Sequence, residues 1–190
     1  MTIAAAFARV FGIAFMCALL GAATTHADDA GPKFRLTDQN GRAVTEQTLT
    51  GKPSVIHFGF THCPVICPTT LYETAEHMKA LGARSDQINF VFVSVDPERD
   101  TPDVLKAYIG SFDDRIIGLT GDEGEVAGLA RALGVSYARQ KLPDGTESIE
   151  HTVYAVLMDS RWRMVGTLFM GYESSSKLVS GRLQSLLDAK

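Results

Sequence analysis

Residues 57–71 read HFGFTHCPVICPTTL and hold Cys63 and Cys67, two of the three cysteines in the chain. The run PSVIHFGF, residues 53–60, is mostly apolar and predicts a strand that is buried on both faces of a parallel sheet. Residues 68–82 predict the following helix, because apolar side chains recur on one of its faces. Those side chains are Leu71, Ala75, Met78 and Leu81. The cysteines therefore lie between a strand and a helix, where they can form a disulfide, a redox couple or half of a metal site.

Strands and helices alternate along the remainder of the chain. Residues 34–45 predict a hairpin that turns at Asn40-Gly41, a dipeptide typical of tight β-turns. Residues 135–150 are a polar excursion, expected to be a hairpin or a loop that turns at residues 143–145. Further strands are predicted at residues 88–96, 116–120, 152–159 and 163–169, and further helices from residue 101 and at residues 122–134 and 174–190.

This order predicts the fold class. It indicates an α/β fold with a mixed central sheet, helices on both of its faces and an N-terminal β-hairpin. A cysteine pair that ends the first central strand and opens the first helix is typical of the thioredoxin-like fold. We therefore expect a thioredoxin-like domain with the cysteines at the carboxyl end of a central strand.

The N-terminus has the composition of a secretory signal peptide. Arg9 precedes an uncharged stretch over residues 10–23, and Thr25-His26-Ala27 fits a small-residue cleavage site. The stretch is shorter than the roughly 20 apolar residues of a membrane span, and an uncleaved anchor is the alternative. We predict a signal peptide at residues 1–27, a single thioredoxin-like domain at residues 28–190, and export to the periplasm or the outer face of the inner membrane.

Export affects how the cysteines and the charge are interpreted. Cys17 belongs to the apolar stretch of the signal peptide, which leaves Cys63 and Cys67 in the mature domain. Close cysteines normally pair in an oxidising compartment, yet a domain of this size does not need one disulfide to fold, so a chemical role is favoured. The net charge of −4, without a long run of like charges, argues against a nucleic-acid partner. We expect a monomer that works close to a membrane.

The spacing of the cysteines and a downstream histidine favour metal binding. Thiolates are stabilised at a helix N-terminus, and cysteines at i and i+4 can face one side of the first turn. Thioredoxin-like oxidoreductases usually separate their cysteines by two residues and set a cis-proline against them. This chain has His151 at that place, and its nearest proline is Pro143. Two thiolates and an imidazole suit copper, whereas structural zinc sites usually have four ligands, so copper is favoured over zinc.

Three stretches resemble the signature sequences of the Sco/SenC family, whose members are copper-binding, thioredoxin-fold proteins that assist assembly of cytochrome c oxidase. They are FGFTHCPVICPTTL, VSVDPERDTPDVLKAY and EHTVYAVLMD, at residues 58–71, 93–108 and 150–159. The resemblance implies Cys63, Cys67 and His151 as copper ligands, and the dinuclear copper centre of oxidase subunit II as the partner. The family usually has an acidic residue where this chain has Val65. That change removes a negative charge beside the metal, but it removes no ligand.

Several functions are compatible with these residues. The favoured one is an exported copper chaperone that holds Cu(I) or Cu(II) and passes it on by ligand exchange. In the enzymatic alternative, a thiol–disulfide oxidoreductase, Cys63 attacks the disulfide of a partner and Cys67 resolves the mixed disulfide. A regulator that senses copper or thiol state is a third possibility. A peroxidase is disfavoured, because no loop with an activating arginine is recognisable.

The remaining histidines and two methionines have less specific interpretations. We expect His62 to orient the cysteine loop rather than bind metal. We expect His57, within the predicted buried strand, to be a core residue, and His77, in the middle of a helix, to be solvated. Met164 and Met170 are expected in the core, as methionines in strands usually are.

Three charged residues follow the second predicted central strand. Asp96, Arg99 and Asp100 lie at its carboxyl end, where open α/β sheets place their sites. They can shape the turn and cap the next helix, or they can influence the dithiol and the recognition of a partner. The sequence favours neither interpretation over the other.

Overall fold

The computed structural model describes residues 31–143, 145, 147–170 and 176–188. The predicted signal peptide, with Cys17, lies outside the described residues. None of the helices within these ranges is long and apolar enough to cross a membrane.

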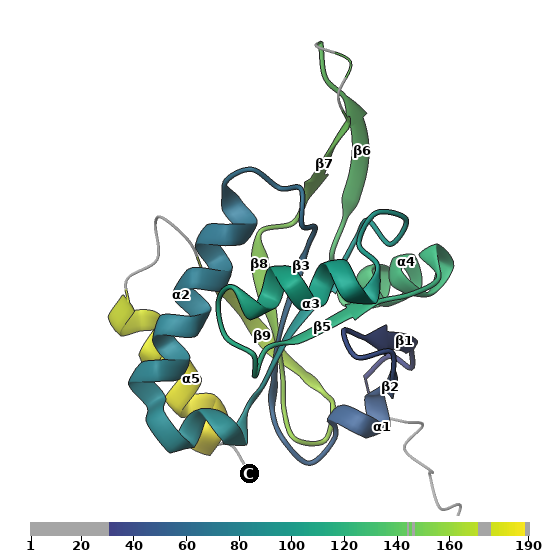
Figure 1. The fold of residues 1–190 in the computed structure, drawn as a ribbon. Helices are drawn as coiled ribbons and strands as arrows, with labels where there is room; N and C mark the ends of the chain where they lie inside the picture. The colour runs from purple at the N-terminus through teal and green to yellow at the C-terminus, as the bar shows by residue number, and fades with distance from the viewer. Residues whose placement is uncertain (1–30, 144, 146, 171–175, 189–190) are drawn as a thin grey trace, which may run out of the picture.

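A seven-stranded mixed sheet forms the centre of the domain (Figure 1). Its strands, in spatial order, are β2 (Ala43–Thr45), β1 (Arg35–Asp38), β5 (Ile117–Thr120), β4 (Asn89–Ser94), β3 (Ser54–Gly59), β8 (Tyr154–Met158) and β9 (Met164–Phe169). β3, β4 and β5 are parallel to one another, and the outer pairs are antiparallel. Every residue of β3 is buried, as expected for a strand covered on both faces. The predicted mixed sheet and N-terminal hairpin are confirmed.

Helices cover both faces of this sheet. The helices are α1 (Glu46–Leu49), α2 (Ile66–Leu81), α3 (Pro102–Gly110), α4 (Glu123–Ala132) and α5 (Ser176–Asp188), and a 3₁₀ helix, η1 (Gly82–Gln87), follows α2. α2, α3 and α5 bury their apolar side chains in one core cluster, while α1 and α4 contribute to the other. Figure 1 shows α2, α3 and α5 on the near face and α4 behind the sheet.

Local signals in the sequence set the starts of α3 and α4. Thr101 is the N-cap of α3, where its side chain accepts a hydrogen bond from the Val104 backbone, and Pro102 takes the first helical position. Asp122 caps α4 by accepting hydrogen bonds from the backbones of Gly124 and Glu125. The expected start of α3 is confirmed.

A second, two-stranded sheet projects from the body of the domain. β6 (Tyr137–Lys141) and β7 (Glu147–His151) pair antiparallel with each other and form a hairpin that rises above the carboxyl ends of the central strands (Figure 1). The hairpin corresponds to the polar excursion of the sequence. Most of its side chains are exposed, but Ile149 is buried in the core beneath it.

Two turns of the central sheet share one hydrogen-bonding arrangement. Asp38, before the β1–β2 turn, accepts hydrogen bonds from the backbone and the guanidinium of Arg42, and Asp159 does the same with Arg163 in the β8–β9 turn. Each turn also contains one residue with positive φ, Gly41 at 77° and Trp162 at 64°. Tryptophan rarely adopts this conformation. Here its ring is buried, and its Nε1 donates to the Pro32 carbonyl at 2.8 Å.

Two expectations about single residues were wrong. His77 is buried rather than solvated, because α5 packs across this part of α2 and places Ser180 Oγ 3.3 Å from His77 Nδ1. Met164 is exposed, because it lies at the start of the edge strand β9. Met170 is buried as expected.

Candidate metal centre

The cysteine loop connects β3 to α2 at the carboxyl edge of the sheet. The backbone N–H of Cys63 donates to the Phe60 carbonyl at 3.2 Å, which closes a tight turn directly after the strand. α2 begins at Ile66, two residues before its predicted start, so Cys67 lies in the first helical turn. Its backbone N–H donates to Cys63 Sγ at 3.4 Å. A free N–H group of the helix N-terminus thus stabilises negative charge on the first cysteine, as expected from the sequence.

Gly59 makes room for the second sulfur. A Cβ atom at this position would lie 2.7 Å from Cys67 Sγ and 2.8 Å from the ring of Phe92, closer than side chains pack. Any larger residue would displace the thiol or the aromatic ring. Sequence reasoning missed this role, although a glycine at the end of a buried strand is a signal of close approach.

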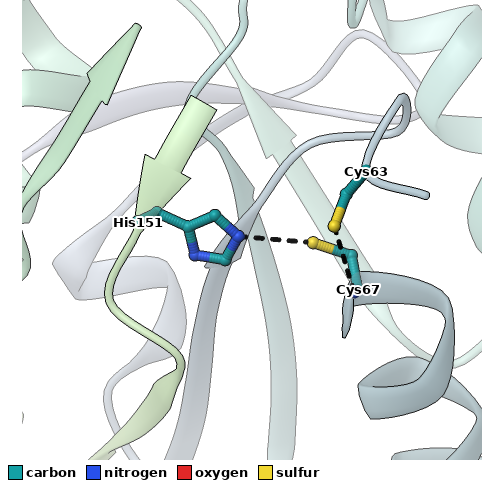
Figure 2. Close-up of side chains that lie close together, drawn as sticks. All are labelled: Cys63, Cys67 and His151. Carbon is teal, nitrogen blue, oxygen red and sulfur yellow. Dashed lines mark hydrogen bonds between the residues drawn. The ribbon is translucent and has the colours of Figure 1, made fainter. Parts of the chain in front are cut away.

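His151 completes the group from the opposite side (Figure 2). It is the last residue of β7, and its Nε2 lies 3.5 Å from Cys67 Sγ. Its Nδ1 lies 2.8 Å from the Thr152 carbonyl oxygen, which can only accept, so Nδ1 carries the proton. Nε2 therefore points its lone pair at the thiols, and the Phe60 ring packs edge-on against the imidazole at 6.1 Å.

The three candidate ligands lie close enough together to hold one ion. Sγ of Cys63, Sγ of Cys67 and a ring nitrogen of His151 all lie within 4.8 Å of one another. Neither cysteine forms a disulfide. Two sulfurs and an imidazole nitrogen held in the correct tautomer fit the ligand preference of copper.

In the metal-free protein the pKa values of the two thiols are shifted in opposite directions. The hydrogen bond from the Cys67 side chain, together with backbone N–H groups of Val65 and Cys67, lowers the pKa of Cys63 to about 4, against the opposing effect of burial. Hydrogen bonding to the Cys63 thiolate, together with burial, raises the pKa of Cys67. The pair therefore holds one proton near neutral pH. A metal that binds both sulfurs must displace that proton.

His62 lies beside the cysteines but points differently. Its side chain is exposed, and its Nδ1 is 3.1 Å from Thr61 Oγ1, a contact suited to orienting the loop. Ligand atoms of His62, Asp96 and Asp100 also lie within 4.8 Å of one another. Both carboxylates already have partners: Asp96 pairs with Arg99 and Arg139, and Asp100 accepts hydrogen bonds from Thr61 and Ser94. This second group is therefore a poor candidate for a cation site.

His57 is a core residue, as expected. It lies beneath the metal centre in β3, where it lines a small cavity together with Cys67 and His151. Burial, followed by the nearby His151, lowers the pKa of His57 to about 4. The imidazole is therefore neutral at physiological pH.

A cleft of about 630 Å³ leads to the candidate ligands from outside. Cys63 and His151 line it, together with residues at the base of the β6–β7 hairpin. Two apolar side chains that line it, Ile66 and Val153, are exposed. Val65, at the position where the family usually has an acidic residue, precedes Ile66 in the chain and is exposed as well.

Comparison with known proteins gives a consistent result. The sequence matches the SCO1/SenC family over residues 22–188. It is 38% identical over 149 residues to an SCO2-like protein of Rickettsia felis, an alignment that covers 77% of this chain and 72% of the relative. It is 37% identical over 157 residues to the mitochondrial protein SCO2 of Saccharomyces cerevisiae, covering 81% of this chain and 52% of the yeast protein. The chain thus spans about half the length of that yeast relative.

A solved structure extends the similarity to the fold. The structure of Bradyrhizobium japonicum ScoI with copper bound aligns with a TM-score of 0.75 and 41% sequence identity. The alignment covers 83% of this chain and 99% of the ScoI chain. The fold described above therefore matches that of a copper-bound relative over nearly the whole length of the relative.

Proposed function

The chain belongs to the SCO1/SenC family, and on that premise we propose that it is a copper chaperone for the assembly of cytochrome c oxidase. In this proposal Cys63, Cys67 and His151 hold the copper. The recipient is the dinuclear copper site of oxidase subunit II, to which the protein either delivers copper or supplies electrons that keep the thiols reduced.

One observation carries this proposal. Three residues that the sequence separates by up to 88 positions bring two sulfurs and a nitrogen within 4.8 Å of one another. The low pKa of Cys63 and the fixed tautomer of His151 put two of the three donors in their metal-binding state before any ion arrives. Copper is the metal found in the ScoI relative, and it suits this donor set.

The unequal burial of the donors suggests an order of release. Cys63 is partly exposed at the cleft, and His151 lies at the same opening, whereas Cys67 is 3% exposed. An incoming thiolate reaches the copper most easily from the side of Cys63 and His151. We therefore expect these two ligands to be exchanged first and Cys67 last.

Copper stoichiometry and visible absorption of the purified protein test the proposal. We expect equimolar copper and a thiolate-to-Cu(II) absorption band, which His151→Ala removes because the nitrogen donor is lost. His62→Ala is the matched control, since it removes an exposed imidazole next to Cys63 that lacks the orientation of a ligand. A wild-type protein without copper, or unaltered Cu(II) binding in His151→Ala, would contradict the three-ligand site.

Thiol–disulfide reduction is a second candidate function, because Cys63 is a thiolate beside a protonated Cys67. The Cys63 thiolate would attack one sulfur of a partner disulfide and release the other as a thiolate. Cys67 would pass its proton to that thiolate and attack Cys63 Sγ, which frees the second partner thiol. The protein would end as a Cys63–Cys67 disulfide, oxidised by two electrons, and the partner would be reduced by two.

A metal-free assay separates this activity from copper delivery. The reduced protein should reduce a small test disulfide stoichiometrically in the presence of a chelator. Cys63→Ser should abolish the reaction, and His151→Ala should retain most of it. If the reduced wild-type protein leaves the disulfide intact, the reductase function is wrong and the chaperone function is unaffected.

We also propose that residues 1–27 direct export and that the copper-binding domain comprises residues 28–190. This proposal rests on the charge and hydropathy pattern of the N-terminus. Fractionation of cells and the mass of the recovered protein test it. Full-length protein in the cytoplasmic fraction would contradict both the export and the cleavage.

A further inference from the structure

Two buried carboxylates of the β4–α3 loop reach in different directions, and each contacts one half of the metal centre. Both Asp96 and Asp100 have fully buried side chains. Asp100 contacts the cysteine loop, and Asp96 contacts the β6–β7 hairpin. The same short loop thus touches the segments that carry the thiols and the imidazole.

On the thiol side, Asp100 holds the residue two positions before Cys63. One carboxylate oxygen accepts the Thr61 hydroxyl at 2.6 Å, and the other accepts the Thr61 backbone N–H at 3.0 Å. Ser94, the last residue of β4, donates to the same carboxylate at 2.6 Å. These bonds fix the cysteine loop to the end of a central strand.

On the imidazole side, Asp96 holds the hairpin through an arginine. Arg139 of β6 places Nη1 3.1 Å from Asp96 Oδ1, and Arg99 pairs with the other carboxylate oxygen. Arg139 is paired with Ile149 across the hairpin, and the next inward-facing pair joins Tyr137 to His151. The ion pair therefore fastens the hairpin two residues from the strand partner of the candidate ligand.

We propose that Asp96 and Arg139 are positioning residues that set the place of His151 relative to the dithiol, an inference that rests on the copper site proposed above. The hairpin pairs with no strand of the central sheet within the described chain. Its location therefore depends on side-chain contacts at its base. Among these the Arg139 guanidinium pairs with a carboxylate that is fully buried and also paired with Arg99, so the attraction acts from a fixed point in the domain.

The chemistry of copper gives this positioning a selective effect. Soft thiolates favour Cu(I), whereas Cu(II) depends more strongly on the imidazole nitrogen. Loosening the hairpin should therefore weaken Cu(II) binding more than Cu(I) binding. Loosening the cysteine loop should weaken both, because both oxidation states use the sulfurs.

Arg139→Met is the most informative variant. It removes the cation but keeps much of the side-chain bulk, and Asp96 remains paired with Arg99, so no unpaired buried charge results. We expect about a 10-fold weaker Cu(II) affinity, the lower end for the loss of a group that orients a ligand. Cu(I) affinity, measured by competition with a chelator, should change much less. Arg139→Lys should restore part of the Cu(II) affinity.

Lys141→Met is the matched control. Lys141 lies two residues further along the same face of β6, is exposed, and makes no ion pair with another described residue. Its replacement removes the same charge from the same strand and should leave both affinities unchanged. An equal loss of Cu(II) affinity in both variants would overturn the proposal in favour of a general effect of charge.

A double-mutant cycle with His151→Ala decides whether Arg139 acts through the histidine. If it does, Arg139→Met has no further effect on Cu(II) affinity once His151 is absent. Thr61→Val, on the thiol side, should still weaken binding in that background. An Arg139→Met effect that is the same with and without His151 contradicts the positioning role.

A metal-free measurement keeps this inference separate from the copper chaperone function. The imidazole resonances of His151 in the reduced protein should shift or broaden in Arg139→Met, and they should stay in place in Lys141→Met. Unchanged resonances would overturn the inference even if the protein binds copper as proposed. Conversely, altered resonances in a protein that binds no copper would reject the proposed function and support the positioning role.

Discussion

The cysteine loop and the β6–β7 hairpin bring the two halves of the candidate metal centre together by different means. The cysteines lie between a fully buried strand and a long helix, and main-chain hydrogen bonds hold their loop on both sides. His151 lies at the base of a projecting two-stranded sheet that is held to the domain by a few side chains. The dithiol geometry should therefore withstand changes to the hairpin, whereas the position of His151 should depend on a few contacts at its base.

Removing a buried thiol tests the fixed half and should have the largest effect. Cys67→Ser replaces a sulfur that is packed against Gly59 and contacted by His151 with a hard oxygen donor. We expect loss of stoichiometric copper of either oxidation state, whereas His151→Ala should retain Cu(I). Copper analysis of the two variants, after reduction and dialysis, measures the Cu(I) that each retains. Equal losses in the two variants would remove the distinction between the halves.

The second-largest effect should come from the low pKa of Cys63, and it should appear in how the thiol reacts as the pH changes. Because the pKa of Cys63 is lowered to about 4, its thiolate fraction in the metal-free protein should stay constant from pH 8 down to about pH 5. At pH 5.5 an ordinary thiol, with a pKa near 8.5, is only about one part in a thousand thiolate. Alkylation of the reduced, metal-free protein should therefore be nearly independent of pH over this range and slow only towards pH 4. A tenfold fall in rate for each pH unit below 8 would contradict the proposed hydrogen bonding.

Overfilling the base of the cysteine loop should have a smaller but clear effect. Gly59→Ala adds a methyl group 2.7 Å from Cys67 Sγ and 2.8 Å from the Phe92 ring. We expect a loss of about 1–3 kcal/mol in the free energy of unfolding, as for other overpacked cores. Denaturant unfolding measures it. Gly128→Ala, within α4, serves as the control, because the added methyl group meets no atom within 4 Å beyond its own stretch of helix; it should raise the free energy of unfolding by about 0.5–1 kcal/mol, since alanine is the better helix former.

Lengthening the tip of the hairpin should have the smallest effect. Lys141 and Glu147 pair at the end of the hairpin remote from His151, and five residues of sequence separate them. Inserting five glycine or serine residues into that connection doubles its length, which costs about 0.6 kcal/mol in closure entropy. Copper affinity should be unaffected, because the base of the hairpin is unchanged. A large loss of Cu(II) affinity would show that the whole hairpin, and not its base, positions the histidine.

The sequence predicted most of the sheet, because strands and turns depend on local patterns, whereas the resemblance to a known family supplied the full set of candidate ligands. Alternation, buried runs and capping residues are readable over a few positions, as at Thr101 and Pro102. The contacts that organise the site were not predictable in this way. The pair Asp96–Arg139 joins residues 43 positions apart, and only the structure shows which segments the side chains of Asp96 and Asp100 contact.

Burial on a helix was also only partly predictable. The helical pattern placed Leu71 and Met78 correctly on the buried face of α2, but it did not include His77. The position of α5 decides that burial, since Ser180 of this helix lies against the histidine. A periodicity within one helix cannot say how many neighbours that helix has.

The contacts of Trp162 with Gly31 and Pro32 fix where the described chain begins relative to the cysteines. Trp162 accepts the Gly31 backbone N–H and donates to the Pro32 carbonyl, in the turn that follows β8. β8 runs antiparallel to β3, with Met158 opposite Ser54, so this turn lies at the end of the sheet remote from the cysteines. Gly31 and the cysteines thus lie at opposite ends of the central sheet. An anchor joined upstream of Gly31 would hold the domain with the edge that carries the candidate ligands facing away from the point of attachment.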